Sequence, residues 1–218
     1  ESKEAFGWSL NQYLQFGGYP GPANLVGEID RWQDYIRSSV VEPALSRDIF
    51  GLTEIRKPAL FRQCFELACG LPAQEMSYQK LVGQLQDSGN LATVRHYLEV
   101  LEQAFLLTLL AKYSSASLKA RTSSPKLLPQ CPALAHCFIN PNTISSDPIW
   151  RGRIIELAVG NELCKRYRKV SYWRSGNYEV DFVVEDNLGK RIAVEVKSGR
   201  LRKSAGLTRF VKEFPGSV

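Results

Sequence analysis

The sequence predicts a mixed α/β fold, in which a helical region over residues 1–145 precedes a smaller αβ domain over residues 146–218. In the first region, apolar residues recur at helical spacing, as at Val94, Leu98 and Leu101. After about residue 168, runs typical of strands alternate with turn sequences. A chain of 218 residues with 44% hydrophobic residues is long and apolar enough to bury such a core.

The first region is expected to be mainly helical. Residues 17–22 are a cluster of glycines and prolines that breaks a helix, and residues 70–72 end another one. Ser77 is a suitable N-cap. The expected elements are helices at about 29–38, 57–68, 77–86 and from 90 or 93 to 105, a short helical segment near 46–49, and a strand at 106–113.

Helix, short helix, turn, longer helix and hairpin is the element order of a winged helix-turn-helix, here at about residues 57–130. An ordinary helical subdomain explains the same pattern and stays open as the alternative. In the winged-helix interpretation, the residues that face DNA are Thr93, Arg95 and His96 on the recognition helix and Lys119, Arg121 and Lys126 on the wing.

Charge is distributed unevenly along the chain. Residues 1–110 carry nine Lys and Arg against 13 Asp and Glu, whereas residues 111–218 carry 19 against nine. A basic half attracts a polyanion, of which nucleic acid is the commonest, although a solvated basic surface is an alternative.

Several classes are disfavoured by composition. No run approaches the ~20 apolar residues that span a bilayer, and the N-terminal residues lack the pattern of a secretory signal. We therefore expect a cytoplasmic location and no membrane partner. The five cysteines are odd in number and fit no disulfide framework or zinc site, so we expect reduced thiols in the core.

The second region is expected to begin near residues 140–150. A helix is predicted at 152–167, strands at 170–174, 178–185 and 191–198, and another helix from about Lys203. A turn centred on Leu188 would pair Glu185 with Arg191, Val183 with Ala193 and Asp181 with Glu195.

Strand side chains alternate between faces. Val180, Phe182 and Val184 are therefore expected on one face. The opposite face would carry Asp181, with Glu195 and Lys197 on the neighbouring strand.

Two adjacent carboxylates repel each other in a half-buried place, and a divalent cation removes that cost. Mg²⁺ or Mn²⁺ suits carboxylate oxygens and a phosphodiester, and Lys197 could orient water or stabilise negative charge. Glu156, on the preceding helix, is a candidate third acid, with Glu162 as a second choice. The alternatives are a surface hairpin with a charged face and, for Glu156, a buried hydrogen bond to the backbone.

These residues resemble a known superfamily. The segments EVDFVV, VEVKSG and GRIIELAVGNEL are similar to those of PD-(D/E)XK nucleases. More closely, the chain resembles the domain of unknown function that follows the ATPase in many bacterial and archaeal AAA-type ATPases, also at YLQFGGYP, SRDIF, NLATVRHYLEVLEQAFLL and SYWRSGNYEVDFVV.

The resemblance implies a winged-helix-like region joined to a restriction-endonuclease-like αβ core. In it, Asp181, Glu195 and Glu156 would hold Mg²⁺ or Mn²⁺ and Lys197 would assist catalysis. Two departures stand out: PKLLPQCPALAHC lacks the family's aspartate, and the chain stops at EFPGSV, where a further core strand is expected. There is no P-loop motif, so an ATPase domain would belong to a longer parent chain.

The resulting hypothesis is a DNA-binding, Mg²⁺-dependent nuclease-like domain that hydrolyses phosphodiesters. The alternatives are a non-catalytic module that binds nucleic acid or protein and regulates the ATPase, and a pure protein-interaction domain. The residues expected to hold phosphates are Arg174, Arg200, Arg202 and Lys203.

Overall fold

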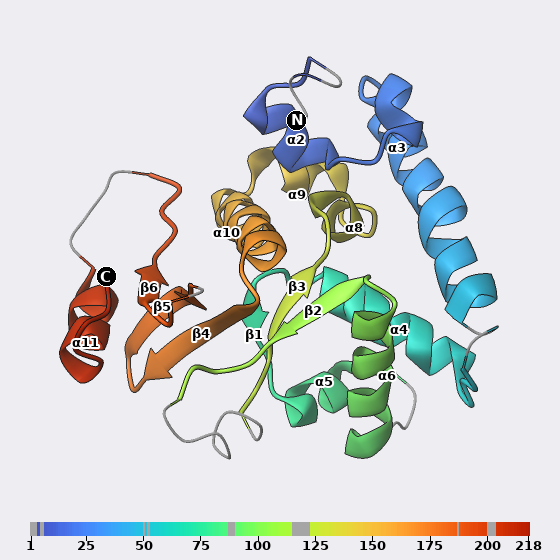
Figure 1. Cartoon of the computed structure of the whole chain (residues 1–218). Helices are drawn as coiled ribbons and strands as arrows, with labels where there is room; N and C mark the ends of the chain where they lie inside the picture. Colours follow the sequence, from blue (N-terminus) through green and yellow to red (C-terminus); the bar gives the residue numbers. More distant parts are fainter. Residues whose placement is uncertain are drawn as a thin grey trace.

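The computed structural model is a mixed α/β structure, whose described residues form two small antiparallel sheets with helices around them (Figure 1). This confirms the predicted class. The structure describes residue 4 and residues 7–49, 51, 53–86, 90–114, 123–186, 188–199 and 204–218. In chain order the elements are α2 (Leu10–Phe16), η1 (Gly21–Leu25), α3 (Ile29–Tyr35), η2 (Ile36–Val41), η3 (Ala44–Ile49), α4 (Pro58–Cys69), β1 (Gln74–Glu75), α5 (Tyr78–Gln84), α6 (Leu91–Gln103), β2 (Leu107–Leu110), β3 (Lys126–Pro129), α8 (Pro132–His136), α9 (Pro141–Ser146), α10 (Pro148–Arg166), β4 (Lys169–Ser175), β5 (Tyr178–Glu185), β6 (Arg191–Val194) and α11 (Ala205–Glu213).

The first sheet has the strand order β1-β3-β2; β1 lies between α4 and α5 in the chain, and β2 and β3 follow α6 (Figure 1). Ser77 caps α5 and Asn90 caps α6, because each side-chain oxygen accepts a backbone N–H three residues further on. The predicted helices of this region are therefore present. The helix expected at 29–38 is longer than predicted, since α3 continues through the π-helical segments η2 and η3.

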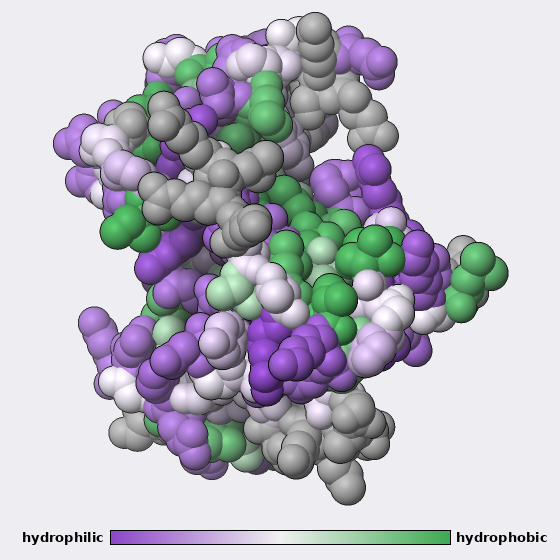
Figure 2. All heavy atoms as spheres, turned by 90° about the vertical axis from the view of Figure 1, so that its left-hand side faces the viewer, coloured by the Kyte–Doolittle hydropathy of each residue, from purple (hydrophilic) through white to green (hydrophobic). Residues whose placement is uncertain are grey.

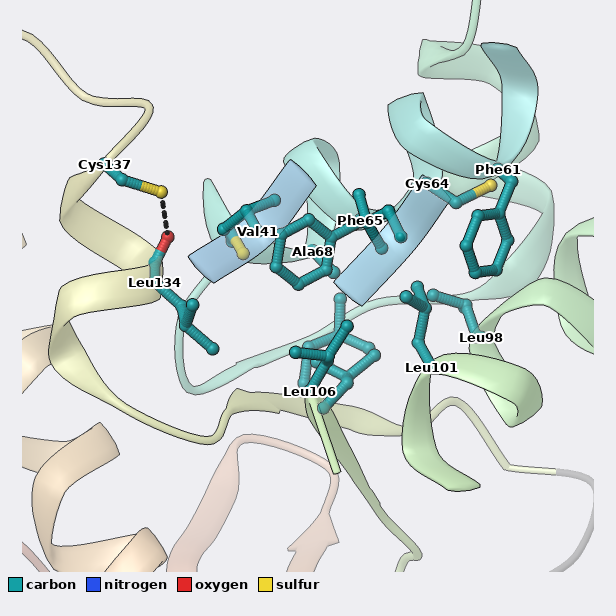
Figure 3. Packing of buried hydrophobic residues seen from close by; sticks show 14 of the residues in the cluster. Val41, Phe61, Cys64, Phe65, Ala68, Leu98, Leu101, Leu106, Leu134 and Cys137 are labelled. Atoms are coloured by element: carbon teal, nitrogen blue, oxygen red, sulfur yellow. Dashed lines mark hydrogen bonds between the residues drawn. The ribbon is translucent and has the colours of Figure 1, made fainter. Parts of the chain in front are cut away.

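The larger apolar core lies between these helices (Figure 3). Phe61 and Phe65 of α4 pack toward Leu98 and Leu101 of α6, and all four side chains are buried. Cys64 is part of the same core, and burial raises the pKa of its thiol to about 12, so the thiol stays protonated. The five cysteines are free thiols in the structure.

The second sheet has the order β4-β5-β6 and lies between α10 and α11. On the α11 side, Trp173 packs edge to face on Phe210, with ring centroids 5.3 Å apart. The turn pairs Glu185 with Arg191 and Val183 with Ala193, which is the predicted register. The third strand is shorter than predicted, because β6 ends at Val194.

The two sheets are joined directly. Beyond β2, Lys112 forms a parallel bridge to Tyr172 of β4. The Tyr113 N–H donates to the Tyr172 carbonyl at 2.6 Å, and the Tyr172 N–H donates to the Ala111 carbonyl at 3.1 Å. These bonds hold the first sheet at a fixed position beside the second.

The side of the molecule that carries α11 is largely hydrophilic, with apolar atoms gathered in the middle of this face (Figure 2). In the C-terminal part of the chain, the exposed large apolar side chains include Leu188, Val211 and Val218. Across the described ranges, no helix is both long enough and apolar enough to cross a membrane.

Gly206 fixes the position of α11 on the sheet. A Cβ atom at this position would lie 1.8 Å from the carbonyl oxygen of Glu179, so Gly206→Ala must push the helix away from β5. We expect Gly206→Ala to lower the free energy of unfolding by about 1–3 kcal/mol in urea denaturation. Gly83→Ala, at an open helical position in α5, should instead raise it by roughly 0.5–1 kcal/mol. Equal effects of the two changes would contradict this account.

Candidate functional site

Glu156 is brought to the second sheet by a close approach of α10. The helix begins at the N-cap Asp147, whose carboxylate accepts the N–H groups of Ile149 and Trp150. A Cβ atom at Gly160 would lie 2.7 Å from the ring of Phe182, so only glycine lets the helix lie this close to β5. Glu156 is four residues earlier on the same helix face and therefore also faces β5.

A β-bulge in β5 turns Asp181 toward this helix. Ser171 pairs with Val183 and Trp173 pairs with Val180, so Asp181 and Phe182 together lie opposite the single residue Tyr172. Phe182 packs in the α10-side core, whereas Val180 and Val183 pack with Phe210 of α11. The prediction that Val180 and Phe182 share a face was therefore wrong, because a bulge interrupts the alternation.

Lys126 joins the two acids. Its Nζ donates to Glu156 Oε1 at 2.6 Å and to the carbonyl oxygen of Asp181 at 3.3 Å, and it lies 3.9 Å from Asp181 Oδ1. Lys126 is the first residue of β3 and is only 8% exposed. The prediction that Lys126 is an exposed DNA contact on the wing was wrong, because its side chain is buried against these carboxylates.

Burial raises the pKa of both acids. Desolvation raises the pKa of Glu156, and the Lys126 ammonium only partly offsets this. Desolvation likewise raises the pKa of Asp181. The N–H of Val196, which donates to Asp181 Oδ2 at 2.7 Å, lowers this pKa but does not cancel the increase. One ammonium group between two carboxylates leaves one negative charge uncompensated, so the pair favours an added proton or cation.

Glu195 and Lys197 lie just beyond the end of β6 and bind each other. Glu195 Oε1 is ion-paired with Lys197 Nζ, and Glu195 Oε2 accepts the hydroxyl of Ser204, the N-cap of α11. The hydrogen bond to Glu195 raises the pKa of Lys197. Asp181 and Glu195 are close enough for the charge of Glu195 to contribute to the raised pKa of Asp181.

The predicted three-acid metal site does not fit this arrangement. Both oxygens of Glu195 are engaged, and an ammonium group lies between Glu156 and Asp181. Within the part of the chain that the structure describes, no three His, Cys, Asp or Glu side chains are grouped to hold a metal ion. The side chains as arranged form ion pairs instead.

The acids open onto a polar cleft of about 370 Å³ between the two sheets. Its charged lining consists of Lys80, Lys126, Arg153 and Arg174 and of Glu75, Glu156, Glu179 and Asp181. Arg174, which was predicted to hold a phosphate, is ion-paired with Glu75 and Glu179. The structure gives no ion pair to Lys80 of α5 or Arg153 of α10 with any residue it describes.

Two of the three residues of α6 that were predicted to face DNA already have partners within the protein. Thr93 donates its N–H and hydroxyl to the N-cap Asn90, and Arg95 pairs with Glu99 at 2.9 Å. His96 is exposed. Five further predicted contacts lie outside the described residues: Lys119, Arg121, Arg200, Arg202 and Lys203.

Sequence reasoning missed Lys80, Arg153 and the role of Lys126 in the acid cluster. A signal for Lys126 exists, since it is a lone cation at the start of the apolar run Leu127-Leu128, and a cation in a buried strand needs a partner. Nothing in the local sequence marks Lys80 or Arg153 as a site residue, because only the tertiary fold places α5 and α10 on the same cleft.

This mixed α/β protein has two joined units around a charged cleft, and comparison with known families gives two matches. A family model described as a domain of unknown function, DUF8612, matches residues 7–143. The chain therefore belongs to the DUF8612 family. A second model, the domain of unknown function DUF4143, matches residues 151–216 and is commonly found C-terminal to AAA-type ATPases. Searches of curated proteins and of solved structures found no match.

The raised pKa of Glu156 predicts a pH-dependent stability. A carboxyl whose pKa is higher in the folded state binds more protons there, so its contribution to the free energy of unfolding is lost as the pH rises from about 4 through the raised pKa. The slope per group is at most about 1.4 kcal/mol per pH unit. We expect Glu156→Gln to flatten the decline in the free energy of unfolding above about pH 4, as measured by urea denaturation.

Glu162→Gln is the matched control, because Glu162 is on the same helix but partly exposed and paired with Lys165 at 2.8 Å. It should leave the pH dependence unchanged. A wild-type decline that persists in Glu156→Gln would show that Glu156 is not its source.

Proposed function

We propose that this chain is a nucleic-acid-binding module, with DNA as the preferred partner. The observation that carries the proposal is that Lys80 and Arg153 line one cleft from two different units, without an ion pair to any residue that the structure describes. Cations placed in this way suit the phosphates of a nucleic-acid backbone.

The distribution of charge in the cleft supports this assignment. Arg174 lies between two glutamates, and Lys126 lies between Glu156 and Asp181, so both cations are already used within the protein. Lys80 and Arg153 remain available for a ligand. The basic half of the sequence adds a longer-range attraction for a polyanion.

The first unit supports the same proposal through its topology. The element order helix, strand, two helices and a hairpin, with the sheet order β1-β3-β2, is consistent with the proposal of a winged helix-turn-helix. In that assignment α6 is the recognition helix. The Arg95–Glu99 pair on its surface is exposed, so exchanging Glu99 for a phosphate costs little.

The match to DUF4143 supports a place beside an ATPase. We propose that the module follows an AAA-type ATPase domain on the parent chain and couples nucleic-acid binding to it. Such a role needs no chemistry from Glu156 or Asp181.

Lys80→Ala and Arg153→Ala should each weaken DNA binding roughly 5–10-fold at 0.1 M salt, because each loses one phosphate contact. The slope of log affinity against log salt should fall by about 1 for each change. Fluorescence anisotropy with single-stranded and double-stranded oligonucleotides measures both quantities.

Lys212→Ala removes an exposed lysine of α11 that does not line the cleft, and it serves as the control for the change in net charge. If all three variants bind alike, the cleft is not the nucleic-acid site. The element order of the first unit would then have to carry the proposal alone.

Hydrolysis of phosphodiesters is a second candidate. It is favoured by the clustering of Asp181, Glu156 and Glu195 around one end of the second sheet, within the order helix, three strands, helix that the nuclease resemblance implies. A carboxyl with a raised pKa is better suited than an ordinary one to exchange a proton with water or with a leaving oxygen.

If the cleft is hydrolytic, Asp181→Asn should lower cleavage of DNA or RNA at least about 100-fold in buffer containing Mg²⁺ or Mn²⁺. Glu162→Gln should retain the wild-type rate. Gel analysis of labelled oligonucleotides decides the matter, and equal background cleavage by wild type and Asp181→Asn removes this candidate.

A further inference from the structure

We propose that the outer edge of β2 binds an extended acidic peptide of a partner protein, which pairs with β2 as an added strand. This binding is separate from nucleic-acid binding and involves none of the residues that line the charged cleft. Three features of the molecule support it: the main-chain groups along the edge, an exposed aromatic ring at its start and the charges beside it.

β2 lies at the edge of the first sheet, whose strand order is β1-β3-β2 (Figure 1). The Leu127 carbonyl oxygen accepts the Ala73 N–H at 2.8 Å, so the main-chain groups of Leu127 face β1. Leu109 lies opposite Leu127, and its own N–H and C=O therefore point away from β3. The Leu109 N–H donates to Glu102 Oε1 at 2.7 Å, so a side chain takes the place of a neighbouring strand.

β4 covers the same edge only after β2 has ended. The Ala111 carbonyl oxygen accepts the Tyr172 N–H at 3.1 Å, next to the parallel bridge between the two sheets. Along β2 itself the edge faces a pocket of about 570 Å³, whose opposite wall includes Cys164 and Val170. A segment bound in this pocket would pair with the outward main-chain groups of β2, as in recognition of a peptide by strand addition.

Phe105 presents an apolar ring at the start of this edge. It follows α6 with a φ of 56°, and its N–H donates to the Glu102 carbonyl at 3.0 Å. The Leu106 N–H donates to the Leu101 carbonyl at 3.0 Å, which completes the helix end known as a Schellman motif. Glycine is the usual residue at this left-handed position.

The phenylalanine is not explained by the folded chain alone. Phe105 lines the pocket, yet the residue is 81% exposed, so it adds little to the core. A left-handed backbone also disfavours a residue with a Cβ atom. An exposed aromatic ring beside a pocket is typical of a surface that binds a protein segment.

The charges beside the pocket select an acidic partner. Its charged lining consists of Glu102, Lys165 and Arg168, and Glu102 is already bonded to Leu109. Arg168 is exposed and has no ion pair among the residues that the structure describes. Lys165 is paired with Glu162 at the surface, where exchange for another carboxylate costs little. A strand that alternates acidic and apolar residues suits both the cations and the apolar wall.

Fluorescence anisotropy of the full chain with a labelled peptide tests the binding. The probe is about ten residues long, alternates glutamate with valine and has blocked ends. Arg168→Glu should weaken its binding at least about tenfold, because attraction becomes repulsion. Arg166→Glu is the matched control and should leave binding unchanged, since Arg166 is exposed two residues away but does not line the pocket.

Methylated peptides test the main-chain pairing. Methyl groups on alternate backbone nitrogens remove the N–H donors along one edge of the peptide and keep every side chain. Methylation along one edge should abolish binding, and methylation along the other should preserve it, because only one edge of an added strand faces β2. A peptide with lysine in place of glutamate should not bind.

Phe105→Gly separates binding from stability. Glycine adopts the left-handed backbone without a Cβ atom, so the melting temperature should rise by about 2–4 °C. Peptide binding should nevertheless weaken at least about fivefold, because the exposed ring is lost. A lower melting temperature together with unchanged binding would show that the ring serves the fold and not a partner.

The remaining outcomes are equally decisive. Lys80→Ala and Arg153→Ala should bind the peptide as wild type does, so failure of the nucleic-acid proposal would leave this result intact. Three results overturn strand addition: no binding of the acidic peptide by wild type, equal binding by wild type and Arg168→Glu, or binding that survives methylation along either edge. Displacement of the peptide by a single-stranded oligonucleotide would assign the pocket to nucleic acid, and a dimer of wild type that Phe105→Gly dissociates would assign it to a second copy. Either finding also overturns the proposal.

Discussion

The ion pair between Lys126 and the carboxylates of Glu156 and Asp181 is the interaction on which the candidate site depends. It joins β3 of the first sheet to α10 and β5 of the second unit. Placing these charges away from water costs several kcal/mol per ion, which only close mutual contact can offset. The contact requires Gly160, which lets α10 approach β5, and the bulge in β5, which turns Asp181 toward the helix.

The local features of the second unit could be predicted from the sequence. A turn around Leu188 and opposite charges at Glu185 and Arg191 set one register for β5 and β6, and the structure has that register. The bulge could not be predicted in this way. It depends on the pairing of β5 with β4, where Tyr172 lies opposite two residues, and alternation along β5 alone contains no sign of it.

The partners of the acids could not be predicted for a related reason. Glu156 and Asp181 are 30 and 55 positions from Lys126 in sequence, and only tertiary packing brings them together. A pattern of exposed cations after a recognition helix led to a wing assignment for Lys126, yet the two leucines that follow it are fully buried. The apolar residues that follow Lys126 in the sequence indicate its burial better than its charge indicates exposure.

The cluster also connects the two regions that match separate families. Lys126 lies within the DUF8612 match at 7–143, whereas Glu156 and Asp181 lie within the DUF4143 match at 151–216. Separating the two regions would break the ion pairs of Lys126 with Glu156 and Asp181 and expose all three charges to water. The parallel bridge between Lys112 and Tyr172 would be lost as well. The cleft and its charges are therefore a property of the two regions folded together, and a ligand bound there would contact both.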